Sequence, residues 1–142
     1  MESLQIVLDI NILYSGFRSK RGASYRLLSL LDSEKFTLNL SVPLVIEYED
    51  VLKRNPPSLH IMDQQIDQFL DYLCLKGKWH EVYFLWRPFL KDPEDDMILE
   101  LAVRANCQYI ITYNRADFSG VNQFGIEVVT AQEFLKLIKE LT

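Results

Sequence analysis

The chain has 142 residues and a formal net charge of −5, and 49% of its residues are hydrophobic. This size and balance are typical of a globular protein, so we expect residues 1–142 to form a single domain. The sequence has no run of about 20 apolar residues and no secretory signal, which excludes a membrane span and argues against export. Isolated Cys74 and Cys107 favour free thiols, so we expect a cytoplasmic protein without a membrane partner.

The first half of the chain predicts an alternation of strands and helices. Leu4–Leu8 is a short apolar run rich in β-branched residues and predicts a buried strand, and Phe36–Leu40 predicts another. Apolar residues at helical spacing predict helices over Gly22–Leu31 and Met62–Leu75. A further helix is expected to start at Ser41-Val42-Pro43 and to end near residue 54, because proline is favoured in a first helical turn.

The second half continues the same alternation. Three short strands are predicted, over Glu81–Leu85, Tyr109–Thr112 and Glu127–Val129. A helix is predicted to begin with Asp92 as its N-cap and Pro93 at its first position. The last helix is expected to begin with a capping box at Thr130. Strands that alternate with helices predict an α/β sandwich around a largely parallel sheet.

Acidic residues follow two of the predicted strands. Asp9 comes directly after Leu8, and Asp117 lies just beyond the strand that begins at Tyr109. Ligands of parallel α/β sheets bind beyond the carboxyl ends of the strands, and an unpartnered buried carboxylate is costly. Both acids are therefore candidate site residues, and Asn11 is placed to orient Asp9 or a ligand. A cap or turn role is the alternative for each acid.

The start of the helix after residue 92 is strongly acidic. Four acids fall within five residues, namely Asp92, Glu94, Asp95 and Asp96. Acids in a first turn also complement the helix dipole, so the cluster alone does not decide between a site and a cap. Asp95 begins the apolar stripe that continues through Ile98 and Ala102. We therefore favour Asp95 over Asp96 as the inward acid and interpret Asp92 as the N-cap.

The acids Asp9, Asp95 and Asp117 are expected at one end of one sheet. Carboxylates brought together either share a proton or gather cations, and hard oxygen ligands suit Mg²⁺ or Mn²⁺. Metal sites of this kind commonly carry out phosphoryl chemistry. His60 and His80 lie outside the cluster and are expected at the surface, so zinc is not favoured.

A basic stretch follows the first acid. The segment between Asp9 and Asp32 has no acidic residue but contains Arg18, Lys20, Arg21 and Arg26. This local patch could bind a phosphate backbone, although a solvated helix face explains it equally well. Tyr14, Phe17 and Tyr25 could stack on bases, but core packing is the simpler interpretation of these rings.

The ordered set of motifs resembles the PIN-domain family. These motifs are Leu8-Asp9-Ile10-Asn11, Gly22-Ala23-Ser24, Glu47-Tyr48-Glu49-Asp50-Val51-Leu52, Asp92-Pro93-Glu94-Asp95-Asp96, Thr112-Tyr113-Asn114 with Asp117-Phe118, and Gly125-Ile126 leading to Thr130-Ala131-Gln132-Glu133-Phe134-Leu135. The chain is most similar to the branch of toxin–antitoxin toxin components related to VapC-type ribonucleases. The resemblance covers nearly the whole chain.

The resemblance implies a three-layer α/β/α fold with a five-stranded parallel sheet. It also implies a Mg²⁺- or Mn²⁺-dependent endoribonuclease, commonly a homodimer or larger assembly inhibited by a small antitoxin. The acids of the family match Asp9, Glu47, Asp95 and Asp117, and periodicity alone would not have chosen Glu47. The resemblance further gives supporting roles to Asn11, Thr112 and Asn114 and makes Asp96 a substitute ligand.

Two departures and two rival functions remain open. Relatives often have glycine where this chain has Tyr113, and some have aspartate where it has Asn114. The first rival is a catalytically weak module that keeps the fold for binding RNA or protein. The second is a phosphatase that uses Asp9 as a nucleophile, as haloacid-dehalogenase-type enzymes do. Those enzymes normally carry a second aspartate where this chain has Asn11.

Overall fold

The structure is a computed structural model, and it describes residues 4–54, 62–82 and 89–139. Its centre is a five-stranded sheet with the strand order β3-β2-β1-β4-β5. The strands are β1 Leu4–Leu8, β2 Phe36–Leu40, β3 Lys78–Trp79, β4 Tyr109–Ile111 and β5 Glu127–Val129. All four pairings are parallel. The predicted parallel α/β sheet is therefore confirmed.

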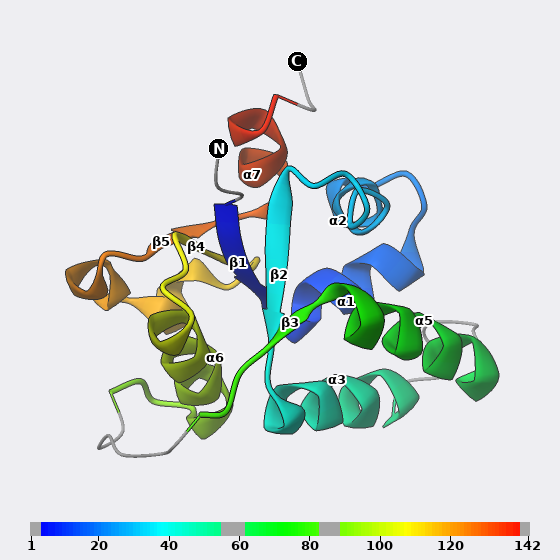
Figure 1. The fold of residues 1–142 in the computed structure, drawn as a ribbon, viewed down its shortest axis with the longest axis horizontal. Coiled ribbons are helices and arrows are strands. Elements are labelled where there is room, and N and C mark those ends of the chain that lie inside the picture. Colours follow the sequence, from blue (N-terminus) through cyan, green and yellow to red (C-terminus); the bar gives the residue numbers. More distant parts are fainter. Residues whose placement is uncertain (1–3, 55–61, 83–88, 140–142) are drawn as a thin grey trace.

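Helices cover both faces of this sheet. They are α1 Ile10–Arg18, α2 Ala23–Leu28, α3 Val42–Arg54, α5 Asp63–Lys76, α6 Pro93–Arg104 and α7 Ala131–Leu137, with two 3₁₀ turns, η1 Arg115–Phe118 and η2 Val121–Phe124. α6 packs on β1, β2 and β4, whereas α1 packs on α2 and α3. Figure 1 shows α6 on the opposite side of the sheet from α1, α3 and α5. The arrangement is the predicted three-layer α/β/α fold.

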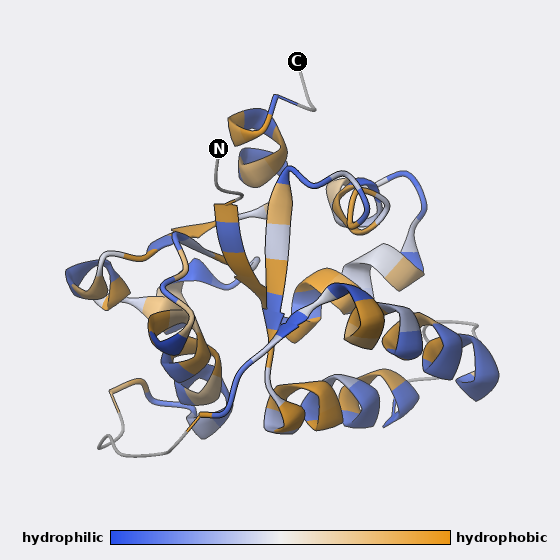
Figure 2. Cartoon of the chain, viewed as in Figure 1, coloured by the Kyte–Doolittle hydropathy of each residue, from blue (hydrophilic) through white to orange (hydrophobic). Residues whose placement is uncertain are grey.

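The core lies along the two central strands. Ile6, Val7 and Leu8 of β1 are fully buried, as are Ile110 and Ile111 of β4. Unbroken apolar runs are expected for parallel strands that are covered on both faces. Figure 2 shows the hydrophobic residues of β1 and the mixed hydrophobic and hydrophilic residues of the surrounding helices. Among the helices of the described part of the chain, none is long and apolar enough to cross a membrane.

Polar caps start the helices where the sequence predicts them. Asp92 accepts a hydrogen bond from the Glu94 backbone N at 3.0 Å, and Pro93 occupies the first helical position of α6. Thr130 forms the predicted capping box with Glu133 at the start of α7. Such caps satisfy backbone N–H groups that have no partner within the helix. Both helix starts are therefore confirmed.

The structure differs from the predicted local structure at two elements. The third strand is Lys78–Trp79 rather than Glu81–Leu85, and residues 83–85 of that prediction lie outside the described residues. Gly77 lies between α5 and this strand and packs closely against Leu40 of β2. A Cβ added at Gly77 would lie 2.3 Å from the Leu40 side chain, so the absence of a side chain lets the chain pass directly from α5 to β3. No helix was predicted over Ile10–Arg18, where the structure has α1 with Ile12 and Leu13 buried.

His80 is not a simple surface residue. It is half-buried, and its Nε2 lies 2.7 Å from Oδ1 of Asn39. Asn39 is fully buried and donates in turn to the Ile6 carbonyl oxygen at 3.2 Å. A buried amide needs such partners, so His80 serves the packing of β2. His60 lies outside the described residues.

Candidate acidic site

Asp9 is held rigidly at the end of β1. It is 6% exposed, and its Oδ1 accepts a hydrogen bond from the Ile10 backbone N at 2.7 Å. Asp9 is thereby the N-cap of α1. Its Oδ2 accepts from Oγ1 of Thr112 at 2.7 Å and from Nδ2 of Asn11 at 3.3 Å. A carboxylate held by this many donors has a fixed orientation.

The three supporting residues surround Asp9. Thr112 is fully buried, and besides donating to Asp9 it accepts from the Asn114 backbone N at 3.0 Å and from Nδ2 of Asn11 at 3.1 Å. Oδ1 of Asn11 accepts from the Tyr113 backbone N at 3.2 Å. These bonds join the start of α1 to the loop after β4, across 101 residues of sequence.

Six acids line one cavity beside Asp9. The cavity measures about 170 Å³, and its acidic lining residues are Asp9, Glu47, Asp92, Glu94, Asp95 and Asp117. None of the described residues that line it is basic. We call this space the acidic cavity. It lies where the carboxyl end of β1 meets α3 and α6, which is the expected ligand position in a parallel sheet.

Asp95 and Asp96 point to different surroundings. Asp95 lines the acidic cavity, but Asp96 does not. Oδ1 of Asp96 instead accepts hydrogen bonds from the backbone N of Leu90 at 2.8 Å and of Phe89 at 3.2 Å. Asp96 thus binds the segment before α6 and does not line the acidic cavity.

The acids of the cavity raise one another's pKa. Burial, followed by the charges of Asp9, Asp92 and Asp117, raises the pKa of Asp95 to about 7. Burial also raises the pKa of Asp9, against the hydrogen bonds from Thr112 and Ile10 that lower it. Each shift means that the ionised form is disfavoured in the absence of a nearby positive charge.

Glu47 adds an oxygen without a protein partner. In the part of the chain that the structure describes, its buried Oε1 has no hydrogen bond. Burial and then the charge of Glu94 raise the pKa of Glu47. A buried polar atom of this kind needs an explanation, and an ion or an ordered water supplies one. Glu94 was not predicted as a site residue. Its only sequence signal is its place in the acidic first turn of α6.

The donor chemistry of the cavity suits a hard divalent cation. Carboxylate and amide oxygens are the ligands that Mg²⁺ and Mn²⁺ prefer, and a cation would relieve the repulsion between the acids. Among the described residues, no group of three or more His, Cys, Asp or Glu side chains is arranged to hold a metal ion as it stands. The side chains would therefore have to move closer together around an ion.

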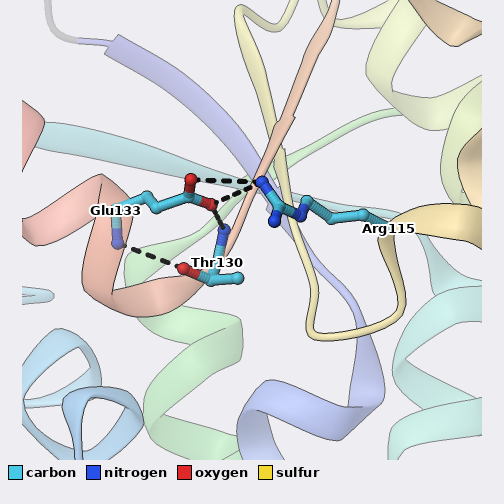
Figure 3. A network of polar contacts seen from close by, with 3 residues as sticks. All are labelled: Arg115, Thr130 and Glu133. Atoms are coloured by element: carbon cyan, nitrogen blue, oxygen red, sulfur yellow. Dashed lines mark hydrogen bonds and ion pairs between the residues drawn. The ribbon is translucent and has the colours of Figure 1, made fainter.

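The loop that carries Asp117 is tied to the last helix. Nη1 of Arg115 lies 3.1 Å from both carboxylate oxygens of Glu133, and Oε1 of Glu133 accepts from the Thr130 backbone N at 2.8 Å (Figure 3). The positive charge of Arg115 is therefore paired with Glu133 of α7. This network fixes η1, which places Asp117 at the acidic cavity.

The predicted basic patch forms a separate feature. Lys20, Arg21 and Arg26 line a cavity of about 670 Å³ between α2 and α7, which we call the basic hollow. It shares no lining residue with the acidic cavity among the described residues. Arg18 lies elsewhere, with its guanidinium carbon 5.9 Å from the ring centre of Tyr14.

Comparison with known families identifies the fold. Residues 5–116 match the sequence profile of the PIN domain, which is more than half of the chain. The chain belongs to the PIN-domain family. PIN domains are generally nucleases that act on RNA or DNA with divalent metals, which supports a hydrolase acting on nucleic acid. A search of curated proteins found no significant match. In this PIN-domain chain the matched segment contains Asp9, Glu47 and Asp95, and Asp117 directly follows it.

Proposed function

We propose that this PIN-domain chain is a Mg²⁺- or Mn²⁺-dependent endoribonuclease whose active site is the acidic cavity. The observation that carries the proposal is the convergence of six acids, from four parts of the sequence, on one cavity without a basic lining residue in the described chain. Such a set is stable only if it shares protons or gathers cations. The resemblance to ribonucleases within the family favours RNA as the substrate.

Four acids are the proposed ligands. Asp9, Glu47, Asp95 and Asp117 would hold one or two ions, with the unpartnered Oε1 of Glu47 as one available donor atom. A bound divalent ion would polarise the scissile phosphate and lower the pKa of a nearby water. Asp9 contributes a carboxylate whose direction Thr112 and Ile10 have already fixed. Asp95, with a pKa of about 7, would lose its proton when the cation arrives.

RNA cleavage by the purified chain tests this proposal directly. A panel of structured and single-stranded RNAs is incubated with Mn²⁺ or Mg²⁺, beside samples with EDTA. Asp95→Asn and Asp96→Asn form a matched pair, since both remove one negative charge from the same turn of α6. We expect EDTA to abolish cleavage, Asp95→Asn to slow it and Asp96→Asn to leave it unchanged. Cleavage that persists in EDTA, or no cleavage of any RNA, contradicts the proposal.

We further propose that the ribonuclease is the toxin of a toxin–antitoxin pair and works in the cytoplasm as a homodimer or larger assembly. The resemblance to VapC-type toxins supports this, and the free thiols of Cys74 and Cys107 suit a reducing compartment. Growth arrest on expression of the wild-type chain, relieved by Asp9→Asn, is the expected result. Normal growth with a folded and RNA-cleaving protein would contradict the toxin assignment.

One observation favours a second function. Because no group of described acids is already arranged to hold a metal, a catalytically weak module that binds RNA or protein remains the alternative. Calorimetry with Mn²⁺ separates the two. Binding that is lost in Asp95→Asn supports the nuclease, and the absence of binding supports the module.

A further inference from the structure

A hollow lined by aromatic rings lies between α1, α2 and α5, the group of helices on one side of the sheet in Figure 1. It measures about 220 Å³, and we call it the aromatic hollow. Four of its lining residues are aromatic, namely Phe17, Tyr25, Phe69 and Tyr72. The acidic cavity uses none of these rings. Phe17, Phe69 and Tyr72 also pack against the hydrophobic core, whereas Tyr25 is exposed.

The rings of the aromatic hollow are held in place by their neighbours. Phe17 and Phe69 meet edge to face, with ring centres 4.9 Å apart. The hydroxyl of Tyr72 donates to the carboxylate of Asp32, which also pairs with Nζ of Lys76 at 2.6 Å. Rings fixed in this way need little reordering to accept a flat ligand, which lowers the entropic cost of binding.

Close helix packing forms the floor of the aromatic hollow. An added Cβ at Gly16 would lie 2.6 Å from Cδ1 of Leu28, so the absence of a side chain lets α2 approach α1. The approach brings Tyr25 beside the rings of α1 and α5. Tyr25 remains 42% exposed, so one part of its ring is accessible to a ligand.

The aromatic hollow and the basic hollow meet at residues of α2. Tyr25 and Ser29 line both spaces, and the basic hollow adds Lys20, Arg21 and Arg26. The chain as a whole has a net charge of −5, so three basic side chains beside the aromatic hollow form a local positive region in an acidic protein. A ligand that fits both spaces needs a flat apolar group attached to an anion, which is the chemistry of a nucleotide.

Tyr113 joins α2 to the loop that lines the acidic cavity. It is 41% exposed, and its hydroxyl oxygen lies 2.6 Å from Oγ of Ser24, the neighbour of Tyr25 in α2. On its other side it precedes Asn114, which lines the acidic cavity. Gly16 follows Asp9 by seven residues along α1, which corresponds to about 10 Å of helix. The aromatic hollow and the acids are therefore close enough for one strand to reach both.

We infer that the aromatic and basic hollows together form a binding site for single-stranded nucleic acid. Bases would stack on Tyr25 within the aromatic hollow, and phosphates would lie against Lys20 and Arg21. The strand would then pass over Tyr113 toward the acids. Only this last step rests on the proposed ribonuclease function, because stacking and phosphate binding need no cleavage.

Binding is measured in EDTA, where the proposed cleavage cannot occur. The probes are fluorescein-labelled 12-nucleotide oligo-U and oligo-A RNAs, followed by fluorescence anisotropy at several salt concentrations. We expect Tyr25→Ala to weaken binding roughly 5- to 150-fold, the range for losing one stacked base, and Tyr25→Phe to restore it. We expect Lys20→Ala/Arg21→Ala to reduce the slope of log affinity against log salt by about 1.4, or about 0.7 for each lost phosphate contact.

The matched control removes the same charge elsewhere. Lys78 and Lys136 are exposed and line neither hollow, so Lys78→Ala/Lys136→Ala should bind like the wild type. Thermal melting of each variant checks that it is folded. Equal losses in the control and in Lys20→Ala/Arg21→Ala would show that only net charge matters and would overturn the inference.

The outcomes separate this inference from the proposed function. Binding that depends on Tyr25, in a chain that cleaves no RNA with Mn²⁺, supports the nucleic-acid site and contradicts the ribonuclease. The opposite result is a chain that cleaves RNA and whose RNA binding is unchanged in Tyr25→Ala and in Lys20→Ala/Arg21→Ala. That result supports the ribonuclease, contradicts the nucleic-acid site and would leave the hollows as a surface for a protein partner. A wild-type chain that binds neither probe overturns the inference.

Discussion

The acidic cavity is assembled from four separate parts of the sequence, whereas the two hollows come largely from residues 16–29. Asp9 in the cavity is buried and fixed by hydrogen bonds from Thr112 and Ile10. Lys20 and Arg21 in the basic hollow are exposed. Chemistry needs groups held in place before the substrate arrives, but attraction of a phosphate backbone needs only charge near the surface. The contrast predicts that substitutions in the acidic cavity reduce activity strongly and that substitutions in the two hollows reduce it much less.

The largest expected effect comes from Asp9→Asn. Asparagine is as good an N-cap as aspartate, so α1 should form normally. The loss of one fixed charge should reduce the rate of RNA cleavage by roughly 10²- to 10³-fold, as for other single groups that stabilise charge in a transition state. Single-turnover cleavage measures the effect, and RNA binding in EDTA serves as the control. If binding falls as much as cleavage, the cavity and the hollows do not have separate roles.

A smaller effect is expected from Thr112→Val, which keeps the shape but removes the hydroxyl. The Asn114 backbone N would lose its acceptor, and Asp9 would lose the donor that lowers its pKa. We expect roughly 10- to 100-fold slower cleavage, as for other losses of a group that orients a metal ligand, and a cost of about 1–3 kcal/mol in stability. Thr112→Ser retains the hydroxyl and should behave like the wild type. A Thr112→Val protein with normal cleavage would show that Asp9 needs no fixed orientation.

Asp95 gives a prediction for stability against pH. Its folded pKa of about 7 lies above its ordinary value of 3.8, so the folded state holds the proton more tightly than the unfolded state. The stability that this proton contributes is present below pH 4 and is lost as pH rises to 7. Without metal at pH 8, Asp95→Asn should therefore be more stable than the wild type. We expect about 1–2 kcal/mol, because solvent screens this half-exposed group.

Thermal melting in EDTA at pH 4 and pH 8 measures the effect of Asp95→Asn, with Asp96→Asn as the matched control. Addition of Mn²⁺ should stabilise the wild type at pH 8 but not Asp95→Asn, since binding to the folded state raises stability. An unchanged difference between wild type and Asp95→Asn at the two pH values would contradict the raised pKa. It would also remove one argument for a cation in the cavity.

Sequence reasoning found the strands that end at the acidic cavity because their signal is local. An apolar run such as Leu4–Leu8 and a cap such as Asp92 can be recognised from a few neighbouring residues. The periodicity around Asp95 likewise distinguished it from Asp96, and the structure places only Asp95 at the cavity. Glu47 came only from the resemblance, because its role depends on the packing of α3 against α6.

The hollows were harder to predict than the cavity. The basic residues stand together in the sequence, but Phe69 and Tyr72 join them only through the packing of α5. Arg18, predicted together with them to bind RNA, lies over Tyr14 and does not line the basic hollow. Features that depend on long-range packing leave no fixed spacing in a single sequence.

The smallest expected effect concerns Glu133, which anchors the loop shared by both regions. The Tyr113 hydroxyl lies 2.6 Å from Oγ of Ser24 in α2, and Asn114 lines the acidic cavity. The ion pair of Arg115 with Glu133 holds this loop to α7 (Figure 3). The pair is half-exposed, so Glu133→Gln should cost at most about 1 kcal/mol. The Thr130 backbone N–H, and then other contacts that include Arg115, lower the pKa of Glu133.

Because the folded pKa of Glu133 is lowered, its contribution is present above its ordinary value of 4.5 and is lost as pH falls below it. Melting temperatures of Glu133→Gln and wild type should therefore differ at pH 7, and the difference should shrink as the pH falls below 4.5. If the loop couples the two regions, Glu133→Gln lowers RNA binding and cleavage by the same small factor. A change in cleavage alone would mean that the loop serves the acidic cavity and that Tyr113 is no part of the path of the strand.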